Sequence, residues 1–202
     1  MVTQSKELNE NARLDLRAAH VLCADASSQG LDILSQILMG LGVQHIVRAQ
    51  TVEEVRRQLG ALPFDLVLID AALGGNGHEV VRWLRGPTVP ANRYVPVLVL
   101  AGHTPRSQVE AARDCGSHFV VTKPISAKTL LERIFWVGRA KRPFVETETY
   151  VGPDRRFKNE GVPGGTQGRR RGDLSAEVAD TAGPNMSQDQ IDTLMKPQKV
   201  AL

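Results

Sequence analysis

The chain has 202 residues, of which 42% are hydrophobic, and a formal net charge of +3 at pH 7. This length allows one domain with a full hydrophobic core and an additional segment. The small net charge argues against a nucleic-acid-binding protein, and no apolar run approaches the roughly 18 residues of a membrane span.

The N-terminal residues 1–16, MVTQSKELNENARLDL, are mostly polar and lack the apolar core of a secretory signal peptide. We expect them to form a flexible N-terminus. Cys23 and Cys115 are isolated thiols without the spacing of metal ligands, as is usual in a reducing compartment. These features together predict a soluble, cytoplasmic protein without a membrane partner.

Residues 17–140 alternate between short apolar runs and segments with helical periodicity, which is the pattern of one α/β domain. The five runs are AAHVLCA, QHIV, DLVLI, VPVLVL and HFVV. Most are continuously apolar rather than alternating, as in strands of a parallel sheet that helices cover on both faces. Five strand–helix units in succession predict a doubly wound, five-stranded parallel sheet.

The helices between these runs have recognisable ends. Thr51 is the expected N-cap of the second helix, and Glu54 completes a capping box with it. Ser126 is the expected cap of the fifth helix, and Gly116 is expected to end the fourth. These signals support a helix after each predicted strand.

Three charged residues end the first, third and fifth of the predicted strands. They are Asp25 in VLCAD, Asp70 in DLVLID and Lys123 in FVVTKP. In a doubly wound sheet, ligands bind outside the carboxyl ends of the strands, so these side chains should converge there. A carboxylate nucleophile, a second carboxylate for a divalent cation and an ammonium facing a phosphoryl oxygen suit phosphoryl transfer. Asp70 alone fits equally well a strand-ending residue that caps a turn.

The motifs VLCAD, DLVLID, VPVLVLAGHT and FVVTKP, with the spacing between them, resemble those of the response-regulator receiver family. These domains have the CheY-like, flavodoxin-like fold of bacterial two-component signalling, and the resemblance covers residues 18–140. It implies that Asp70 is phosphorylated by a histidine kinase or a phosphotransfer protein, and that Lys123 contacts the phosphoryl group. It also implies a magnesium site formed by Asp25, Asp70 and the carbonyl of Ala72, and a cis Lys123–Pro124 peptide.

Three positions depart from the family pattern. Ala26 stands where receivers usually carry a second acidic residue that binds magnesium directly, so we expect magnesium to bind weakly. Ala101 replaces the hydroxyl residue that usually follows the fourth strand. Val120 replaces the aromatic residue that usually rotates inward on activation, and the adjacent Phe119 should point to the other face. The usual relay between these two positions is therefore absent.

These departures leave two hypotheses open. The first is an atypical single-domain response regulator that is phosphorylated on Asp70 and acts through protein–protein contacts, with chemotaxis or motility as candidate pathways. Because Asp70 would be a stoichiometric acceptor, no enzymatic turnover is implied. The second hypothesis is a phosphorylation-independent pseudo-receiver adaptor, in which Asp70 and Lys123 form an ion pair.

Residues 141–185 are rich in Gly, Pro and Arg and poor in large apolar side chains. Such a composition buries too little surface to offset the entropy of ordering, so we predict a disordered basic linker. Arg155, Arg156 and the run at 169–171 leave open a third hypothesis, an anion-binding tail for nucleic acid or a cyclic dinucleotide. The scarcity of interleaved aromatic residues argues against nucleic acid as a partner.

Residues 186–197 are predicted to form a short amphipathic helix. Ser187 and Gln190 form a capping box, and Ile191, Leu194 and Met195 form one apolar stripe. The segment SQDQIDTLM also resembles the CheY-binding peptides of the flagellar switch protein and the chemotaxis phosphatase, although a generic amphipathic helix is an alternative. Those peptides dock on the receiver face made by the fourth helix, fifth strand and fifth helix. We therefore expect the helix to dock on such a face, either its own or that of a CheY-like partner.

Overall fold

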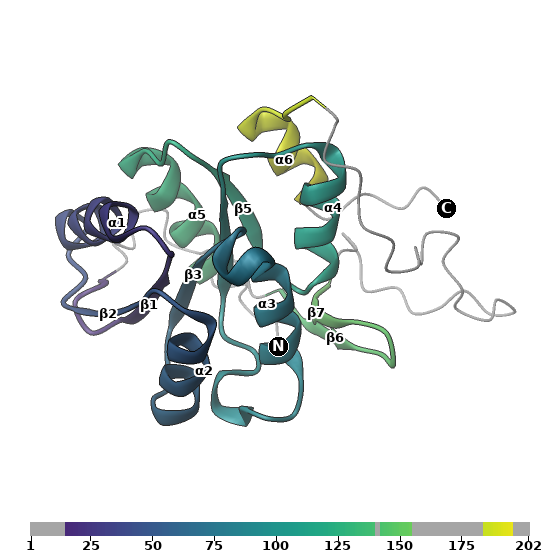
Figure 1. The fold of residues 1–202 in the computed structure, drawn as a ribbon, viewed down its shortest axis with the longest axis horizontal. Coiled ribbons are helices and arrows are strands. Elements are labelled where there is room, and N and C mark those ends of the chain that lie inside the picture. The colour runs from purple at the N-terminus through teal and green to yellow at the C-terminus, as the bar shows by residue number, and fades with distance from the viewer. Residues whose placement is uncertain (1–14, 140–141, 155–183, 196–202) are drawn as a thin grey trace, which may run out of the picture.

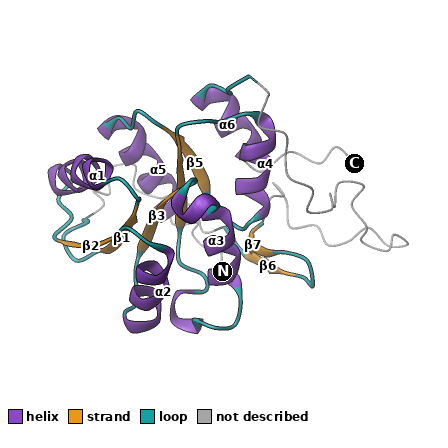
Figure 2. Cartoon of the chain, in the orientation of Figure 1, coloured by secondary structure: helices purple, strands orange, loops and turns teal. Residues whose placement is uncertain are grey.

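The computed structural model describes residues 15–139, 142–154 and 184–195. A five-stranded parallel sheet with the strand order β2-β1-β3-β4-β5 lies at its centre (Figures 1 and 2). The strands are β1 (His20–Ala24), β2 (His45–Ala49), β3 (Leu66–Asp70), β4 (Val97–Ala101) and β5 (Phe119–Thr122). The predicted doubly wound, flavodoxin-like fold is therefore confirmed.

Helices connect the parallel strands and cover both faces of the sheet. They are α1 (Ser28–Gly40), α2 (Val52–Ala61), α3 (Gly77–Arg85), α4 (Arg106–Asp114) and α5 (Ala127–Arg139). Figure 1 shows α1 and α5 on one side of the sheet and α2, α3 and α4 on the other. Two short 3₁₀ helices, Leu73–Gly75 and Pro90–Asn92, lie before and after α3. None of the helices in the described ranges is both long and apolar enough to span a membrane.

The core forms because the central strands are buried along their whole length. Every residue of β3 and β4 is buried, including the final Asp70, as expected of a sheet packed on both faces.

Alternate residues of β5 face opposite sides of the sheet. Phe119 contacts Trp136 of α5 at a ring-centroid distance of 4.6 Å, whereas Val120 faces α3 and α4. The prediction that these two residues point to opposite faces is confirmed.

The helix ends agree with the signals in the sequence. The Thr51 hydroxyl accepts a hydrogen bond from the backbone N–H of Glu54 at 3.2 Å, and the Glu54 side chain reaches back to the backbone ahead of the helix. The Ser126 hydroxyl accepts a hydrogen bond from the backbone N–H of Thr129 at 3.0 Å. Gly116 follows α4 with a φ of +93°, a conformation that favours glycine. Local capping chemistry therefore sets these boundaries.

A two-stranded antiparallel hairpin follows α5 and consists of β6 (Phe144–Glu146) and β7 (Val151–Pro153). The prediction of a disordered linker over residues 141–185 is therefore wrong for this part, while residues 155–183 lie outside the described residues. The Phe144 ring lies 5.5 Å from the His118 ring and 5.1 Å from the Arg85 guanidinium. These tertiary contacts order a segment whose composition suggests disorder.

The last described element is α6 (Gln188–Met195), which lies within the predicted helix at 186–197. The Ser187 hydroxyl accepts a hydrogen bond from the N–H of Gln190 at 3.3 Å, and the Gln190 side-chain oxygen accepts one from the N–H of Ser187 at 2.9 Å. The predicted capping box is confirmed. The helix lies against β5 and beside α4 of its own chain (Figure 1). Of the two predicted docking arrangements, the structure has the one in cis.

Candidate functional site

Asp25, Asp70 and Lys123 meet at the carboxyl edge of the sheet, as their places at the strand ends predict. Asp25 directly follows β1, Asp70 ends β3 and Lys123 directly follows β5. The Lys123 ammonium donates a hydrogen bond to Oδ2 of Asp25 at 2.7 Å and another to Oδ2 of Asp70. The two aspartates are 4% and 8% exposed, whereas the lysine side chain is 30% exposed. One cation therefore bridges two nearly buried anions.

Each remaining carboxylate oxygen accepts a backbone hydrogen bond. Oδ1 of Asp25 accepts one from the N–H of Ser27 at 2.9 Å, and Oδ1 of Asp70 accepts one from the N–H of Ala72 at 2.7 Å. All the carboxylate oxygens of this pair thus have a donor, which compensates for their removal from water. These bonds also orient the two side chains so that both Oδ2 atoms point at the same ammonium.

The charge of Lys123 is stabilised by its two partners. Burial on its own lowers its pKa, but the hydrogen bonds and negative charges of Asp25 and Asp70 outweigh burial and raise the pKa above its ordinary value. Lys123 is therefore a protonated donor at physiological pH. Such an ammonium is suited to neutralising negative charge on a phosphoryl oxygen.

The backbone after β5 fixes where the Lys123 side chain begins. The N–H of Lys123 donates a hydrogen bond to the carbonyl of Ala101 at 2.8 Å, which extends the ladder between β4 and β5 by one residue. The following Lys123–Pro124 peptide bond is cis, as the family resemblance implies. The lysine therefore starts from the sheet itself rather than from a loop.

Two glycines allow the backbone to approach this cluster closely. A Cβ atom on Gly30, in the first turn of α1, would lie 2.6 Å from Oδ2 of Asp25. A Cβ atom on Gly77, at the start of α3, would overlap the carbonyl oxygen of Asp70. Neither glycine is distinctive in the sequence, because spacing alone does not show where a backbone passes close to another residue. A larger residue at either position would have to displace the cluster.

The residues that the family resemblance assigns to a magnesium site supply oxygen donors of a suitable kind, but few of them. Magnesium prefers carboxylate and carbonyl oxygens in octahedral coordination, and Asp25, Asp70 and the Ala72 carbonyl are of that kind. Ala26 contributes no carboxylate, and the Lys123 ammonium already lies between the two that are present. Among the described residues, no group of three or more His, Cys, Asp or Glu side chains could hold a metal ion. The donors present are therefore of the kind that magnesium prefers, but the set is incomplete.

Ala101 and Val120, the two positions without the usual relay side chains, line the same cavity. It lies between the sheet, α3 and α4 and has a volume of about 10 Å³. This is room for about one water molecule. Helix α3 contributes His78 to the cavity wall, and burial lowers the pKa of His78 to about 4, with a smaller effect from the charge of Arg82.

The family model of the response regulator receiver domain matches residues 21–135, which is more than half of the chain. The chain belongs to the response regulator receiver family. The matched region runs from β1 into α5 and includes Asp25, Asp70 and Lys123. The β6–β7 hairpin and α6 lie beyond the part of the receiver that the family model matches.

Two curated relatives of this receiver are much longer proteins. The chain is 25% identical over 140 residues to the sensory/regulatory protein RpfC of Xanthomonas campestris pv. campestris. It is 28% identical over 137 residues to the sensor histidine kinase GacS of Pseudomonas protegens. These matches cover 69% and 64% of this chain but 19% and 14% of the relatives. The chain thus spans less than a fifth of the length of these relatives.

Solved structures of receiver domains have the same fold. The chemotaxis response regulator CheY4 of Vibrio cholerae is 23% identical with a TM-score of 0.54, and the match covers 59% of this chain and 98% of that one. A CheY-like receiver domain protein of Methanospirillum hungatei JF-1 is 22% identical with a TM-score of 0.52, covering 58% and 90% of the two chains. At these identities the likeness establishes the shared fold alone.

Proposed function

We propose that this receiver is an atypical response regulator of a two-component phosphorelay that accepts a phosphoryl group on Asp70. One observation carries the proposal: the nearly buried Asp70 carboxylate and the Lys123 ammonium are in direct contact at the carboxyl edge of the sheet. A histidine kinase or a phosphotransfer protein would supply the phosphoryl group. The relative GacS, itself named a sensor histidine kinase, supports a donor of this class.

The proposed reaction is a single displacement at phosphorus. A carboxylate oxygen of Asp70 attacks the phosphorus of a phosphohistidine, the new O–P bond forms as the N–P bond breaks, and the imidazole leaves. Lys123 stays protonated and compensates for the negative charge on the phosphoryl oxygens. Asp25, Asp70 and the carbonyl of Ala72 would hold magnesium, which supplies further charge neutralisation when bound. The protein accepts one phosphoryl group per chain, so it is a substrate of this reaction and not its enzyme.

The proposed output of this cytoplasmic regulator is a protein–protein contact made by the receiver and its C-terminal helix. The apolar residues Ile191, Leu194 and Met195 of α6 are the proposed contact residues, and a CheY-like receiver is a candidate partner. Ile191 and Met195 are buried against their own domain, so this contact requires release of the helix. Chemotaxis and motility remain the candidate pathways, because the segment SQDQIDTLM resembles CheY-binding peptides. The Arg-rich run at 169–171 lies outside the described residues, so anion binding by the tail stays a prediction.

A phosphorylation-independent adaptor is the second candidate, and the saturated ion pair favours it. The carboxylate oxygens of Asp25 and Asp70 all have donors without a phosphoryl group. In an adaptor, Lys123 would only hold three strand ends together. The missing relay side chains at Ala101 and Val120 are consistent with this function too.

Phosphotransfer distinguishes the two candidates. The full chain is incubated with magnesium and a panel of radiolabelled, autophosphorylated histidine kinases, and the wild type is compared with Asp70→Asn and Asp65→Asn. Asp65 is exposed and precedes the same strand at its opposite end, so its variant is a matched control. We expect labelling of the wild type and Asp65→Asn and none of Asp70→Asn. Labelled Asp70→Asn contradicts the assignment, and no labelling by any donor favours the adaptor.

A further inference from the structure

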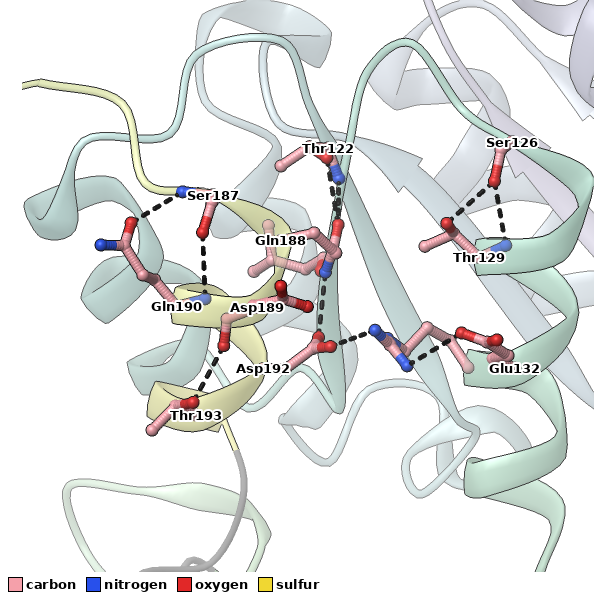
Figure 3. A network of polar contacts seen from close by, with 12 residues as sticks. Thr122, Ser126, Thr129, Glu132, Ser187, Gln188, Asp189, Gln190, Asp192 and Thr193 are labelled. Atoms are coloured by element: carbon pink, nitrogen blue, oxygen red, sulfur yellow. Dashed lines mark hydrogen bonds and ion pairs between the residues drawn. The ribbon is translucent and has the colours of Figure 1, made fainter.

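Strand β5 is an edge strand of the sheet, and α6 occupies its free edge. The side-chain amide of Gln188 lies along this edge (Figure 3). Its Oε1 accepts a hydrogen bond from the N–H of Thr122 at 2.9 Å, and its Nε2 donates one to the carbonyl of Val120 at 2.9 Å. One side chain thus satisfies a donor and an acceptor that an additional strand would otherwise use.

A second set of polar contacts ties the segment before α6 to the loop after β4. Oδ1 of Asn185 accepts a hydrogen bond from the N–H of Thr104 at 2.8 Å, and the Thr104 carbonyl accepts one from the N–H of Met186 at 2.7 Å. The Thr104 hydroxyl donates to the Met186 carbonyl at 3.1 Å. Thr104 is 3% exposed. Its polar groups are therefore satisfied by a segment 81 positions later in the chain.

An ion pair joins α6 to α5. One oxygen of the Asp192 carboxylate accepts a hydrogen bond from the Arg133 guanidinium, and the other accepts one from Nε2 of Gln188 at 3.0 Å (Figure 3). The Asp192 and Arg133 side chains are 10% and 14% exposed. Arg133 also lies over the Phe119 ring, 5.6 Å from its centroid. Arg133 also lies 3.9 Å from the exposed Glu132 carboxylate, so Asp192 is its partner on the buried side. Since a buried charge without its partner is strongly unfavourable, α5 presents a cation that favours a carboxylate at this position.

Apolar side chains fill the space between these polar contacts. Ile191 is fully buried and Met195 is 3% exposed, and both belong to the hydrophobic core. The N-terminal cap of α6 is made locally by Ser187 and Gln190. The contacts that Gln188 makes with the sheet are therefore additional to helix formation, and they select the surface on which the helix lies.

We propose that the face formed by α4, β5 and α5 is a helix-binding site whose resident, displaceable ligand is the segment 185–195 of the same chain. The site selects a capped helix that carries Gln188 at its first position, Ile191 three residues later and Asp192 four residues later. A helix this short is marginal on its own in water, so α6 depends on the site for its structure. A tethered ligand has an effective concentration on the order of millimolar, and any other partner for this face must displace it. Phosphorylation of Asp70 is not needed for this inference.

The test uses the full chain and, as probe, a fluorescent peptide with the sequence of residues 184–196. The wild type, the double variant Gln188→Ala/Ile191→Ala and the single variant Asp192→Asn are titrated with the peptide by fluorescence anisotropy. We expect the wild type to bind weakly, because its own helix competes. Each variant should bind the peptide about tenfold more tightly or better, since losing a buried anchor weakens the resident helix by about that factor. Thr193→Ala, on the exposed side of α6, should match the wild type.

Equal peptide binding by the wild type and every variant overturns the proposal. So does equally tight binding of a peptide that carries Gln188→Ala, because recognition of the β5 edge would then be absent. Light scattering tests whether α6 docks on a second copy instead. If the wild type is dimeric and the double variant is monomeric, α6 lies on a second copy and docking in cis is overturned. Amide exchange in β1 and β3 should not change in any variant, which shows that the domain stays folded.

Discussion

Acidification should destabilise this receiver, and His78 should account for a defined part of the loss. His78 lies on α3 against the sheet and is 5% exposed. Burial, helped by the charge of Arg82 and opposed by that of Glu79, lowers its pKa from 6.5 to about 4. In the unfolded chain the pKa returns to about 6.5. Below that pH the unfolded state therefore binds a proton that the folded state excludes.

The sign and size of the effect follow from this difference in pKa. The stability that comes from neutral His78 is fully present above pH 6.5 and is lost as the pH falls from there toward 4. One pKa unit corresponds to about 1.4 kcal/mol, so the loss reaches about 2 kcal/mol at pH 5 and about 3 kcal/mol below pH 4. His118 acts in the same direction, because burial lowers its pKa well below the ordinary value. The wild type therefore loses more than His78 alone predicts.

The assay is urea-induced unfolding at pH 7 and pH 5, with the wild type compared with His78→Gln. The loss of unfolding free energy between the two pH values should be about 2 kcal/mol smaller in the variant, which has no titrating group at this position. Asn76→Ala is the control, because Asn76 is exposed and carries no titratable group, so its variant should lose as much as the wild type. Equal losses in the wild type and His78→Gln would refute the argument from burial.

Two further substitutions test the site and the fold. Ala26→Asp adds the carboxylate that the magnesium site lacks and should raise magnesium affinity in calorimetric titration by about tenfold or more. Equal affinity in the wild type would mean that Asp25 does not correspond to the first of the two acidic residues that receivers usually carry. Asn92→Ala removes a fully buried amide that accepts a hydrogen bond from the N–H of Phe64 and donates to two carbonyls near the end of α2. It should lower the free energy of unfolding in urea by about 2–4 kcal/mol, whereas the exposed Asn76→Ala should change it by less than about 0.5 kcal/mol.

Much of this fold could be predicted from the sequence because its signals are local. Continuous apolar runs mark strands that are covered on both faces, and caps such as Thr51 and Ser126 mark where helices begin. The convergence of Asp25, Asp70 and Lys123 needed only the topology, since parallel strands place their carboxyl ends at one edge of a sheet. Local pattern and topology together were sufficient for the residues of the candidate site.

Features that depend on contacts between distant residues could not be predicted in this way. The hairpin over residues 144–153 has the composition of a linker, and the side chains that hold it, Arg85 and His118, lie far earlier in the sequence. Gly30 and Gly77 are similar cases. Their lack of a side chain matters only because the fold brings the two aspartates of the site against their backbone.

Helix α6 combines both situations. Its cap and its apolar stripe are local, so the sequence predicts the helix. The stripe shows that the helix needs an apolar surface but does not identify that surface. From the sequence alone, docking on the receiver of the same chain and docking on a partner's receiver are therefore equally well supported. The choice is made by polar contacts with distant residues, in which Gln188 bonds the edge of β5 and Asp192 pairs with Arg133.

The contacts of α6 and of the segment before it fall on β5 and on the loop that follows β4. Gln188 bonds the carbonyl of Val120 itself. Thr104, which binds the segment before α6, lies on the loop that directly follows Ala101 at the end of β4. Helix α6 is therefore in direct contact with Val120, one of the two positions where the usual side chain is absent.

This placement gives the proposed phosphorylation of Asp70 a route to the C-terminal helix that needs neither a hydroxyl nor an aromatic relay. Lys123 contacts Asp70 directly, and its neighbour Thr122 donates its backbone N–H to Gln188. A rearrangement at Asp70 that moves Lys123 acts on the same stretch of β5 that holds α6. Thermodynamic linkage is reciprocal. If the rearrangement changes the free energy of α6 attachment, then attachment of α6 changes the free energy of the rearrangement by the same amount. Any such coupling would pass from Lys123 along the backbone of β5 to Gln188, because Thr122 is bonded to Gln188 and directly precedes Lys123.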